Sequence, residues 1–588
     1  MRRYLINFSV AGLAAFVLAL CASGSATAAT AANAQSPLGM NLVNINYYTD
    51  EQPFLNILKT AALSPTDSSG WVTHNSKGGA FNTNESAYLQ LDANGYPTTM
   101  TASSGDSNQQ FDSVAVLLLR DLPKANAGTG ITYPSGQYVV LYDGQGTLTY
   151  GFDATLASSA PGRDVLNVNA TGGGILLIIK STDPNHTGNY IRNIRLVKAE
   201  QESLLAGGGI FNPAFLNMLK NFRVVRGMQW LNTDSEGGKI VNWSARPHLT
   251  DAGYGGSYGG PVEVVLQLCN AVGADCWVNV PHTANDDYIT QMATVAHSML
   301  GTSQKVYIEF SNEVWNSGFP QFHYAVAQGQ LTWPKAGASA DYGANWYGMR
   351  TAQTCDIWKA IWKTDASRVV CVMGAQAYNA WTATQALDCS LWSAAPCAQN
   401  HGIGALATAP YFANVTPSAA WASQADNGLS SLFDLLNTSD EQHTVSYEAK
   451  MKTAIAPYNL PIISYEGGQG LVAFPHYAWG SPISNLYVSA QRDPRMAAVY
   501  AKELSDWKAN GGTLYTVFAD ISPPSVYGNF GALESVYDTT TPLSSAPPKW
   551  QALQNFISQN KCWWANCVGT IGTATAPTPM PPSNVTVK

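Results

Sequence analysis

The sequence has little charge. Only 12% of its 588 residues are charged, and the formal net charge is −8. Proteins that bind nucleic acid neutralise phosphates with clustered Lys and Arg, so this composition argues against a nucleic-acid partner. Hydrophobic residues make up 46% of the chain and aromatic residues 11%, whereas disordered chains are poor in aromatics and rich in charge. We therefore expect a globular protein with one large domain and an accessory domain.

The sequence also lacks a long apolar run that would predict a membrane span. The uncharged, mostly apolar stretch from Phe8 to Ala22 is too short for a comfortable span. It follows two arginines and precedes Ala-x-Ala sequences that end at Ala28 and Ala34, which is the order of a secretory signal peptide. We predict a signal peptide over residues 1–34 and a mature protein that is secreted or periplasmic.

No cluster of residues has the spacing of a metal site, and the sequence predicts neither a metal nor a cofactor. Of the nine cysteines, Cys21 would leave with the signal peptide, so eight remain in four close pairs. A zinc site would need closer ligands, such as Cys-x-x-Cys with a nearby His. In an oxidising compartment, disulfides are the expected state. The predicted pairs are Cys269–Cys276, Cys355–Cys371, Cys389–Cys397 and Cys562–Cys567.

The order of predicted elements suggests an α/β fold with an insertion. A strand over 39–48 and a helix over 53–62 form a first unit, within residues 35–68. Short β-rich runs separated by Gly, Asn, Asp and Ser then fill residues 69–200, which is typical of a β-sandwich. We expect this sandwich to be inserted between the first helix and the second strand, either as a carbohydrate-binding module or as a support.

Helices and strands alternate through residues 201–568 and bring the strand count to eight. Eight strands alternating with helices are typical of a (β/α)₈ TIM barrel. The segment 569–588 is rich in Thr, Ala and Pro and is expected to be a flexible tail.

Two carboxylates stand where such a barrel places its chemistry. Active sites of these barrels lie at the C-terminal ends of the strands. Glu313 follows the predicted fourth strand and Glu466 ends the seventh, so their side chains can face each other across the barrel mouth. Glycoside hydrolysis uses such a pair, one carboxyl group protonated and the other ionised. Either residue alone could instead be an ordinary surface carboxylate.

The two segments carry a resemblance to a known group. EFSNEVWN at 309–316 and ISYEGGQG at 463–470, together with the eightfold rhythm, resemble clan A of the retaining glycoside hydrolases, which includes cellulases, mannanases and xylanases. The resemblance covers the barrel, and it does not single out one family within the clan.

The resemblance implies roles for five residues. Glu313 resembles the general acid/base, Glu466 the nucleophile, and Asn312 the amide that binds the sugar 2-hydroxyl. Tyr411 resembles the tyrosine that hydrogen-bonds the nucleophile, and Arg226 the arginine that lowers its pKa. Arg226 could equally serve in a structural salt bridge.

Other residues are expected around the site with an alternative open for each. His282 resembles a histidine near the cleaved sugar, or it is a satisfied loop histidine. Many clan members carry Trp after strand eight as the floor of the sugar site, where this chain has Phe518. The tryptophans expected in the loops at the barrel mouth could compensate for that difference or could simply pack: Trp230, Trp315, Trp381 and Trp479. Glu309, inside the strand, is the competing acid and a candidate ion-pair partner of Arg226.

These features predict a secreted retaining β-glycoside hydrolase that acts on a polysaccharide or oligosaccharide, with β-glucan as one candidate. The alternatives are a transglycosylase that uses the same residues and a non-catalytic carbohydrate-binding protein. The sequence does not predict the sugar, its linkage, endo or exo action, or the oligomeric state.

Overall fold

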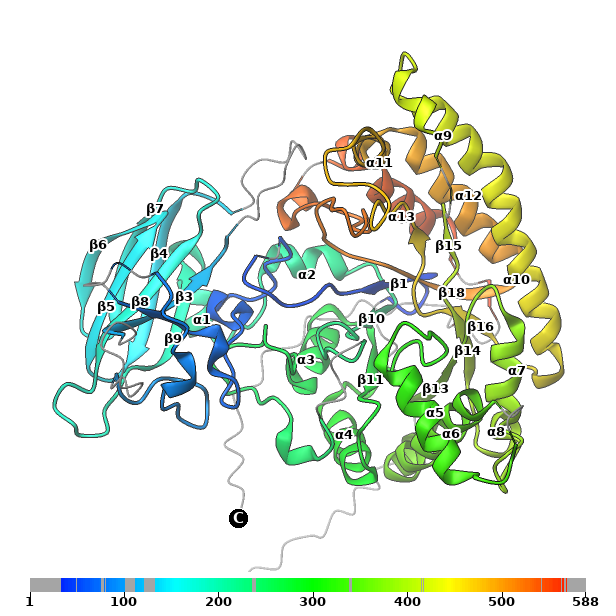
Figure 1. Ribbon diagram of the computed structural model, residues 1–588, viewed down its shortest axis with the longest axis horizontal. Coiled ribbons are helices and arrows are strands. Elements are labelled where there is room, and N and C mark those ends of the chain that lie inside the picture. The colour runs from blue at the N-terminus through cyan, green and yellow to red at the C-terminus, as the bar shows by residue number, and fades with distance from the viewer. Residues whose placement is uncertain are drawn as a thin grey trace, which may run out of the picture.

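A computed structural model gives the fold of the protein (Figure 1). It describes residues 33–48, 50–75, 79, 81–100, 111–120, 133–234, 240–337, 341–413, 415, 417–540, 542–561, 563–564 and 567. The predicted signal peptide up to residue 32, the predicted tail, and Cys562 lie outside the described residues.

Eight parallel strands close into a barrel, as the sequence predicts. Each strand pairs with the next in the order of the chain, and β18 returns to pair with β1 through Tyr515 and Leu38. The barrel strands are β1 (Leu38–Asn41), β10 (Val224–Arg226), β11 (Asp275–Val280), β12 (Val306–Phe310), β13 (Val369–Gly374), β14 (Ala405–Thr408), β16 (Ile462–Ser464) and β18 (Gly512–Val517).

The barrel strands are short apolar segments, which suits a parallel sheet covered on both faces. In β11 and β12 every residue is buried, including the polar Asn279 and Glu309. The α-helices of the structure are α1 (Glu202–Ala206), α2 (Pro213–Leu219), α3 (Val262–Val272), α4 (Asp286–Met299), α5 (Pro320–Thr332), α6 (Tyr342–Trp362), α7 (Ala380–Asp388), α8 (Cys397–Asn400), α9 (Leu429–Leu435), α10 (Glu441–Ile455), α11 (Pro482–Arg492), α12 (Arg495–Ala509) and α13 (Pro548–Gln559).

The predicted helix over 53–62 is wrong. That segment holds only a 3-10 turn, Ile57–Thr60, which begins where the Asn56 side chain accepts a hydrogen bond from the amide of Leu58. Its apolar residues pack toward two different cores, so their spacing is not that of one helical face. Among the described residues between β1 and β10, the first helix longer than five residues is α2, and the additional strands enter before this helix rather than after it.

Two four-stranded antiparallel sheets lie between β1 and β10 in the sequence and beside the barrel in space (Figure 1). They share a buried core that is separate from the main core of the barrel and includes Trp71, Tyr138 and Leu177. One sheet has the order β2 (Val72–His74), β3 (Ser113–Leu118), β8 (Ile175–Thr182), β5 (Gly146–Phe152), and the other β6 (Ala154–Ala160), β7 (Arg163–Val168), β4 (Gly136–Asp143), β9 (Arg192–Lys198).

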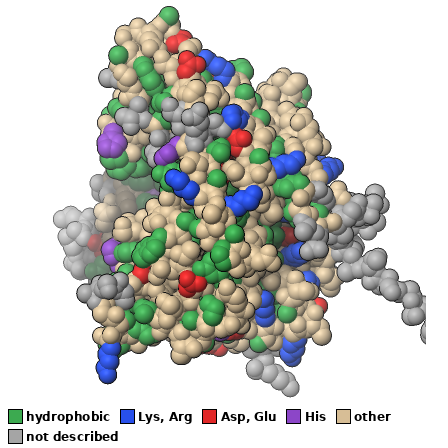
Figure 2. All heavy atoms as spheres, turned by 90° about the vertical axis from the view of Figure 1, so that its right-hand side faces the viewer, with side chains coloured by type: hydrophobic (Ala, Val, Ile, Leu, Met, Phe, Trp, Pro, Cys, Tyr) green, Lys and Arg blue, Asp and Glu red, His purple; other side chains and the backbone are tan. Residues whose placement is uncertain are grey.

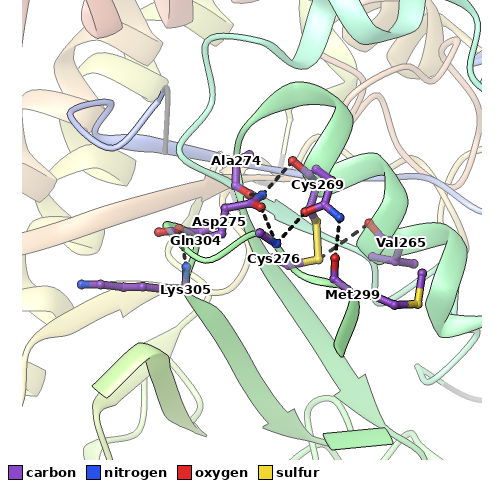
Figure 3. Close-up of a disulfide and its surroundings, with 10 residues drawn as sticks. Val265, Cys269, Ala274, Asp275, Cys276, Met299, Gln304 and Lys305 are labelled. Atoms are coloured by element: carbon purple, nitrogen blue, oxygen red, sulfur yellow. Dashed lines mark hydrogen bonds between the residues drawn. A yellow bond between two sulfur atoms is a disulfide. The ribbon is translucent and has the colours of Figure 1, made fainter. Parts of the chain in front are cut away.

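Three of the four predicted disulfides are confirmed: Cys269–Cys276, Cys355–Cys371 and Cys389–Cys397. Cys567 is also disulfide-bonded, but its predicted partner lies outside the described residues. The Cys269–Cys276 bond joins α3 to the N-terminal half of β11, and Gln304 donates a hydrogen bond of 2.9 Å to the Cys269 carbonyl beside it (Figure 3). It therefore braces the end of the strand opposite to the predicted site.

The surface reflects the low charge of the sequence. Figure 2 shows a face on which charged side chains are scattered among uncharged ones. Within the part of the chain that the structure describes, no helix combines the length and apolar character needed to cross a membrane.

Candidate active site

Arg226, the last residue of β10, is fully buried. It donates hydrogen bonds to four side chains at the C-terminal end of the barrel. Its guanidinium donates to Glu466 Oε1 at 2.8 Å and to Glu309 Oε2 at 2.9 and 3.2 Å. It also donates to Asn312 Oδ1 at 2.8 Å and to Asn41 Oδ1 at 3.0 Å. A planar fork of donors suits several acceptors at once, and here it joins side chains from the ends of three other strands, β1, β12 and β16.

Glu309 is the structural acid of this network. Besides Arg226, its Oε2 accepts hydrogen bonds from Trp277 Nε1 at 2.9 Å and from Asn279 Nδ2 at 2.8 Å, both from β11. Buried charges are tolerated where they are paired and hydrogen-bonded. The ion pair between Glu309 and Arg226 that the sequence suggests is present. It compensates the buried negative charge of Glu309, one of the two carboxylates that contact the guanidinium.

Glu466 follows β16 and lies between a cation and a hydroxyl. Its Oε1 accepts from Arg226, and its Oε2 accepts from Tyr411 Oη at 2.9 Å. Burial raises the pKa of Glu466 to about 7, with the nearby Glu313 carboxyl also raising it, whereas Arg226 and Tyr411 oppose that rise. Both partners stabilise the ionised form of Glu466.

Glu313 lies three residues beyond Phe310, the last residue of β12, where the chain turns sharply. Ser311 has φ +62° and Glu313 has φ +44°, a left-handed conformation that is uncommon for residues other than glycine. The Glu313 carboxyl accepts from Tyr465 Oη at 3.0 Å and from Asn316 Nδ2 at 2.9 Å. Burial raises its pKa, and both of these hydrogen-bond donors are uncharged.

The two carboxyl groups line one cavity of about 380 Å³. Arg226 donates directly to Glu466, while the hydrogen-bond donors to Glu313 are neutral, so the two carboxyl groups lie in different electrostatic surroundings. This arrangement can supply a nucleophile and an acid to the same molecule. The lining is Met228, Gln229, Asp234, Asn312, Glu313, Phe319, Tyr378, Tyr411, Phe412, Glu466, Gly470, Val472, Phe518 and Phe530.

Six of the residues predicted at or near the site do not line this cavity: Arg226, which acts on it through Glu466 and Asn312, the fully buried Trp230, and His282, Trp315, Trp381 and Trp479. His282 is buried after β11, its ring against Tyr324, and burial lowers its pKa to about 4. Trp315 is half-buried, Trp381 is 54% exposed on α7, and Trp479 is half-buried before α11. Their predicted contacts with a sugar stay predictions.

Among the residues that the sequence did not predict at the site, Asn41, Asn316 and Tyr465 take part in its hydrogen-bond network. Asn41 ends β1 and donates to the Tyr465 carbonyl at 2.9 Å, which ties β1 to the Glu466 segment. Tyr465 and Asn316 stand in the same two motifs as the carboxylates, so their position in the sequence was a usable signal. Among the described residues, no group of three or more His, Cys, Asp or Glu side chains is placed to hold a metal ion.

No protein-family model matches the sequence, and no curated protein matches it. The solved structures that it resembles include glycoside hydrolases. One is a GH5-4 broad specificity endoglucanase from an uncultured bacterium, with 13% identity, a TM-score of 0.31, and coverage of 59% of this chain and 84% of that one.

Two further structures extend the comparison. The chain resembles a Cellulomonas fimi endo-beta-1,4-mannanase double mutant at 11% identity and a TM-score of 0.28, over 51% of this chain and 57% of the mannanase. It also resembles a 4-O-alpha-L-rhamnosyl-beta-D-glucuronidase from Fusarium oxysporum at 12% identity and a TM-score of 0.32, over 57% and 62% of the two chains. At these values the likeness by itself assigns neither a family nor an activity.

Proposed function

We propose that the protein is a retaining β-glycoside hydrolase with Glu466 as nucleophile and Glu313 as general acid and base. One observation carries the proposal: two carboxyl groups line the same cavity, one buried against Arg226 and one partly buried against neutral donors. Retaining hydrolysis requires this division between an ionised and a protonated carboxyl group.

In the first step the Glu466 carboxylate attacks the anomeric carbon of the sugar. The glycosidic C–O bond breaks, and Glu313 gives its proton to the departing oxygen, which leaves as an alcohol. Glu466 becomes an ester of the sugar. Before the attack, Arg226 and Tyr411 donate hydrogen bonds to the Glu466 carboxylate and orient it. During the attack Glu466 loses its negative charge as the ester bond forms.

In the second step Glu313, now ionised, takes a proton from a water molecule. The water oxygen attacks the anomeric carbon, the ester bond breaks, and Glu466 returns to its carboxylate form. Two displacements at one carbon restore the original anomeric configuration.

Asn312 and Phe518 complete the proposed sugar site. Arg226 fixes the Oδ1 atom of Asn312, which leaves its amide nitrogen to donate to a sugar hydroxyl. Phe518 follows β18 and lines the cavity with Phe530, so aromatic surface is present on this wall without a tryptophan. Aromatic rings suit the apolar faces of sugars.

We further propose that the chain is secreted or periplasmic, which the three disulfides support. The proposed domain division keeps the insertion at 69–200 as one sandwich domain, which its separate core supports, and the barrel at 35–68 and 201–568.

Glu313→Gln and Glu466→Gln test the assignment with little change of shape. Each variant should lose turnover by about a thousandfold or more on a panel of β-linked polysaccharides, since a general acid or a nucleophile is removed. Circular dichroism should show the same fold as the wild type. Full activity in either variant would reject its role, and sugar binding without turnover in the wild type would favour a non-catalytic protein.

A further inference from the structure

A second hollow adjoins the catalytic cavity. It has a volume of about 300 Å³, which is within the range of small-molecule sites, and shares Gln229 and Asp234 with the catalytic cavity. Its lining is Asn44, Ile45, Asn46, Tyr48, Gln229, Trp230, Asn232, Asp234, Tyr254, Gly255, Gly256, Ser257 and Gly259. A chain molecule in the catalytic cavity could therefore continue into this hollow without leaving the protein surface.

The lining chemistry fits an uncharged sugar. Four amide side chains, from three Asn and one Gln, can each donate and accept hydrogen bonds, as sugar hydroxyls do. Tyr48 and Tyr254 add aromatic surface. Among the described residues of the lining there is no Lys or Arg, and Asp234 is the only acidic one, so none of them offers a cation to a phosphate or another anion.

The wall of the hollow is a glycine loop, residues 252–260, and the segment leading into the inserted sheets supports it. The amide of Tyr254 donates to the Lys59 carbonyl at 2.8 Å, and the amide of Gly255 donates to the Ala61 carbonyl at 2.9 Å. Ala252 donates to the Asn94 carbonyl at 2.7 Å and is buried in the core of the inserted sheets. This wall is thus continuous with the packing of the insertion.

Glycine is required at two positions of this contact, Gly253 and Gly255; a Cβ atom on Gly253 would lie 2.2 Å from the Ala61 carbonyl oxygen. A Cβ atom on Gly255 would lie 2.4 Å from the carbonyl oxygen of Thr60 and 3.1 Å from that of Ile45. Both are backbone atoms, so the loop and the segment beneath it would have to separate. Gly255 therefore permits the close approach that fixes this side of the hollow.

We propose that this hollow, the glycine-walled pocket, binds a second, uncharged sugar unit of the substrate and that the inserted sheets hold its wall in place. The proposal rests on the proposed glycoside hydrolysis and adds to it that the substrate is an oligosaccharide or polysaccharide. It also assigns the insertion a supporting role in substrate length recognition.

The test uses the full chain and β-1,4-linked glucose oligosaccharides from the disaccharide to the hexasaccharide. In the wild type, kcat/KM should be higher for the hexasaccharide than for the disaccharide. Asn44→Ala removes an exposed lining amide, and Gly255→Ala displaces the wall. The hexasaccharide advantage is the ratio of kcat/KM for the hexasaccharide to kcat/KM for the disaccharide. Each variant should reduce this ratio by about threefold to tenfold, which is the cost of one hydrogen bond to the substrate.

Gly207→Ala is the matched control, because its Cβ would lie 3.4 Å from the Ser203 carbonyl oxygen, an ordinary contact outside the pocket. It should keep the full advantage. An unchanged advantage in Asn44→Ala and Gly255→Ala, or none in the wild type, would overturn the pocket while leaving hydrolysis intact.

If the wild type cleaves none of these oligosaccharides, the proposed hydrolysis of this substrate fails separately. Calorimetric titration of the hexasaccharide then decides on the pocket. Binding to the wild type that weakens in Asn44→Ala supports it, and equal or absent binding overturns it.

Discussion

Two tyrosines allow the roles of the carboxyl groups to be tested independently. Tyr411 donates to Glu466 at 2.9 Å and Tyr465 donates to Glu313 at 3.0 Å, and each hydrogen bond lowers the pKa of its carboxyl partner. Replacing each tyrosine with phenylalanine removes one hydrogen bond and keeps the ring.

The expected magnitude follows from the kind of hydrogen bond. A hydrogen bond to a charged group contributes about 1.5–3 kcal/mol. One pKa unit corresponds to about 1.4 kcal/mol, so Tyr411→Phe should raise the pKa of Glu466, already near 7, by about one to two units. A nucleophile must be ionised, and a higher pKa means that it stays protonated to higher pH. The acidic limb of the kcat/KM profile should therefore move to higher pH, with about a tenfold to hundredfold loss below it.

Tyr465→Phe should act on the other limb. Loss of its hydrogen bond raises the pKa of Glu313, so the general acid keeps its proton to higher pH and the alkaline limb moves up. Profiles of kcat/KM from pH 4 to 10, measured with thermal unfolding to verify the fold, separate the two effects. An acidic limb that stays in place in Tyr411→Phe would refute the role of Glu466. If Tyr411→Phe moves the alkaline limb and Tyr465→Phe the acidic limb, Glu313 is the nucleophile and Glu466 the general acid.

Two further changes test the supports of the site. Arg226→Met removes the buried partner of Glu309 and Glu466 and should lower the free energy of unfolding by about 3–5 kcal/mol in urea denaturation; an unchanged midpoint would contradict the central role of Arg226. The double change Cys355→Ser and Cys371→Ser opens a loop with a sequence separation of 16 and should cost about 3 kcal/mol. An unchanged Tm would show that this disulfide does not stabilise the fold.

The sequence was sufficient for the barrel because each strand is a short apolar segment between helices. The polar residues Asn312, Glu313 and Glu466 interrupt or end those segments, which made them visible without a structure. The prediction of a helix over 53–62 was wrong because the apolar residues of this segment do not form one face. They serve two cores, the barrel and the inserted sheets, and local spacing cannot distinguish two faces of contact from one helical face.

The site network depended on contacts that no local pattern encodes. Asn41 reaches Arg226 across 185 positions of sequence, and Tyr465 reaches Glu313 across 152. Tertiary packing sets the direction of side chains: it places Tyr465, after β16, on Glu313, and it leaves Trp381 exposed on α7. The sequence supplied the carboxylates and, through the resemblance, Arg226 and Tyr411 as the donors to Glu466, but it did not supply the donors to Glu313.

Proton NMR of the first product formed from a β-linked substrate tests the central claim most directly. With Glu466 as nucleophile and two displacements, the new reducing end should appear first as the β-anomer and only later equilibrate. A first product in the α-configuration would show a single displacement and would contradict the proposed roles of both carboxyl groups.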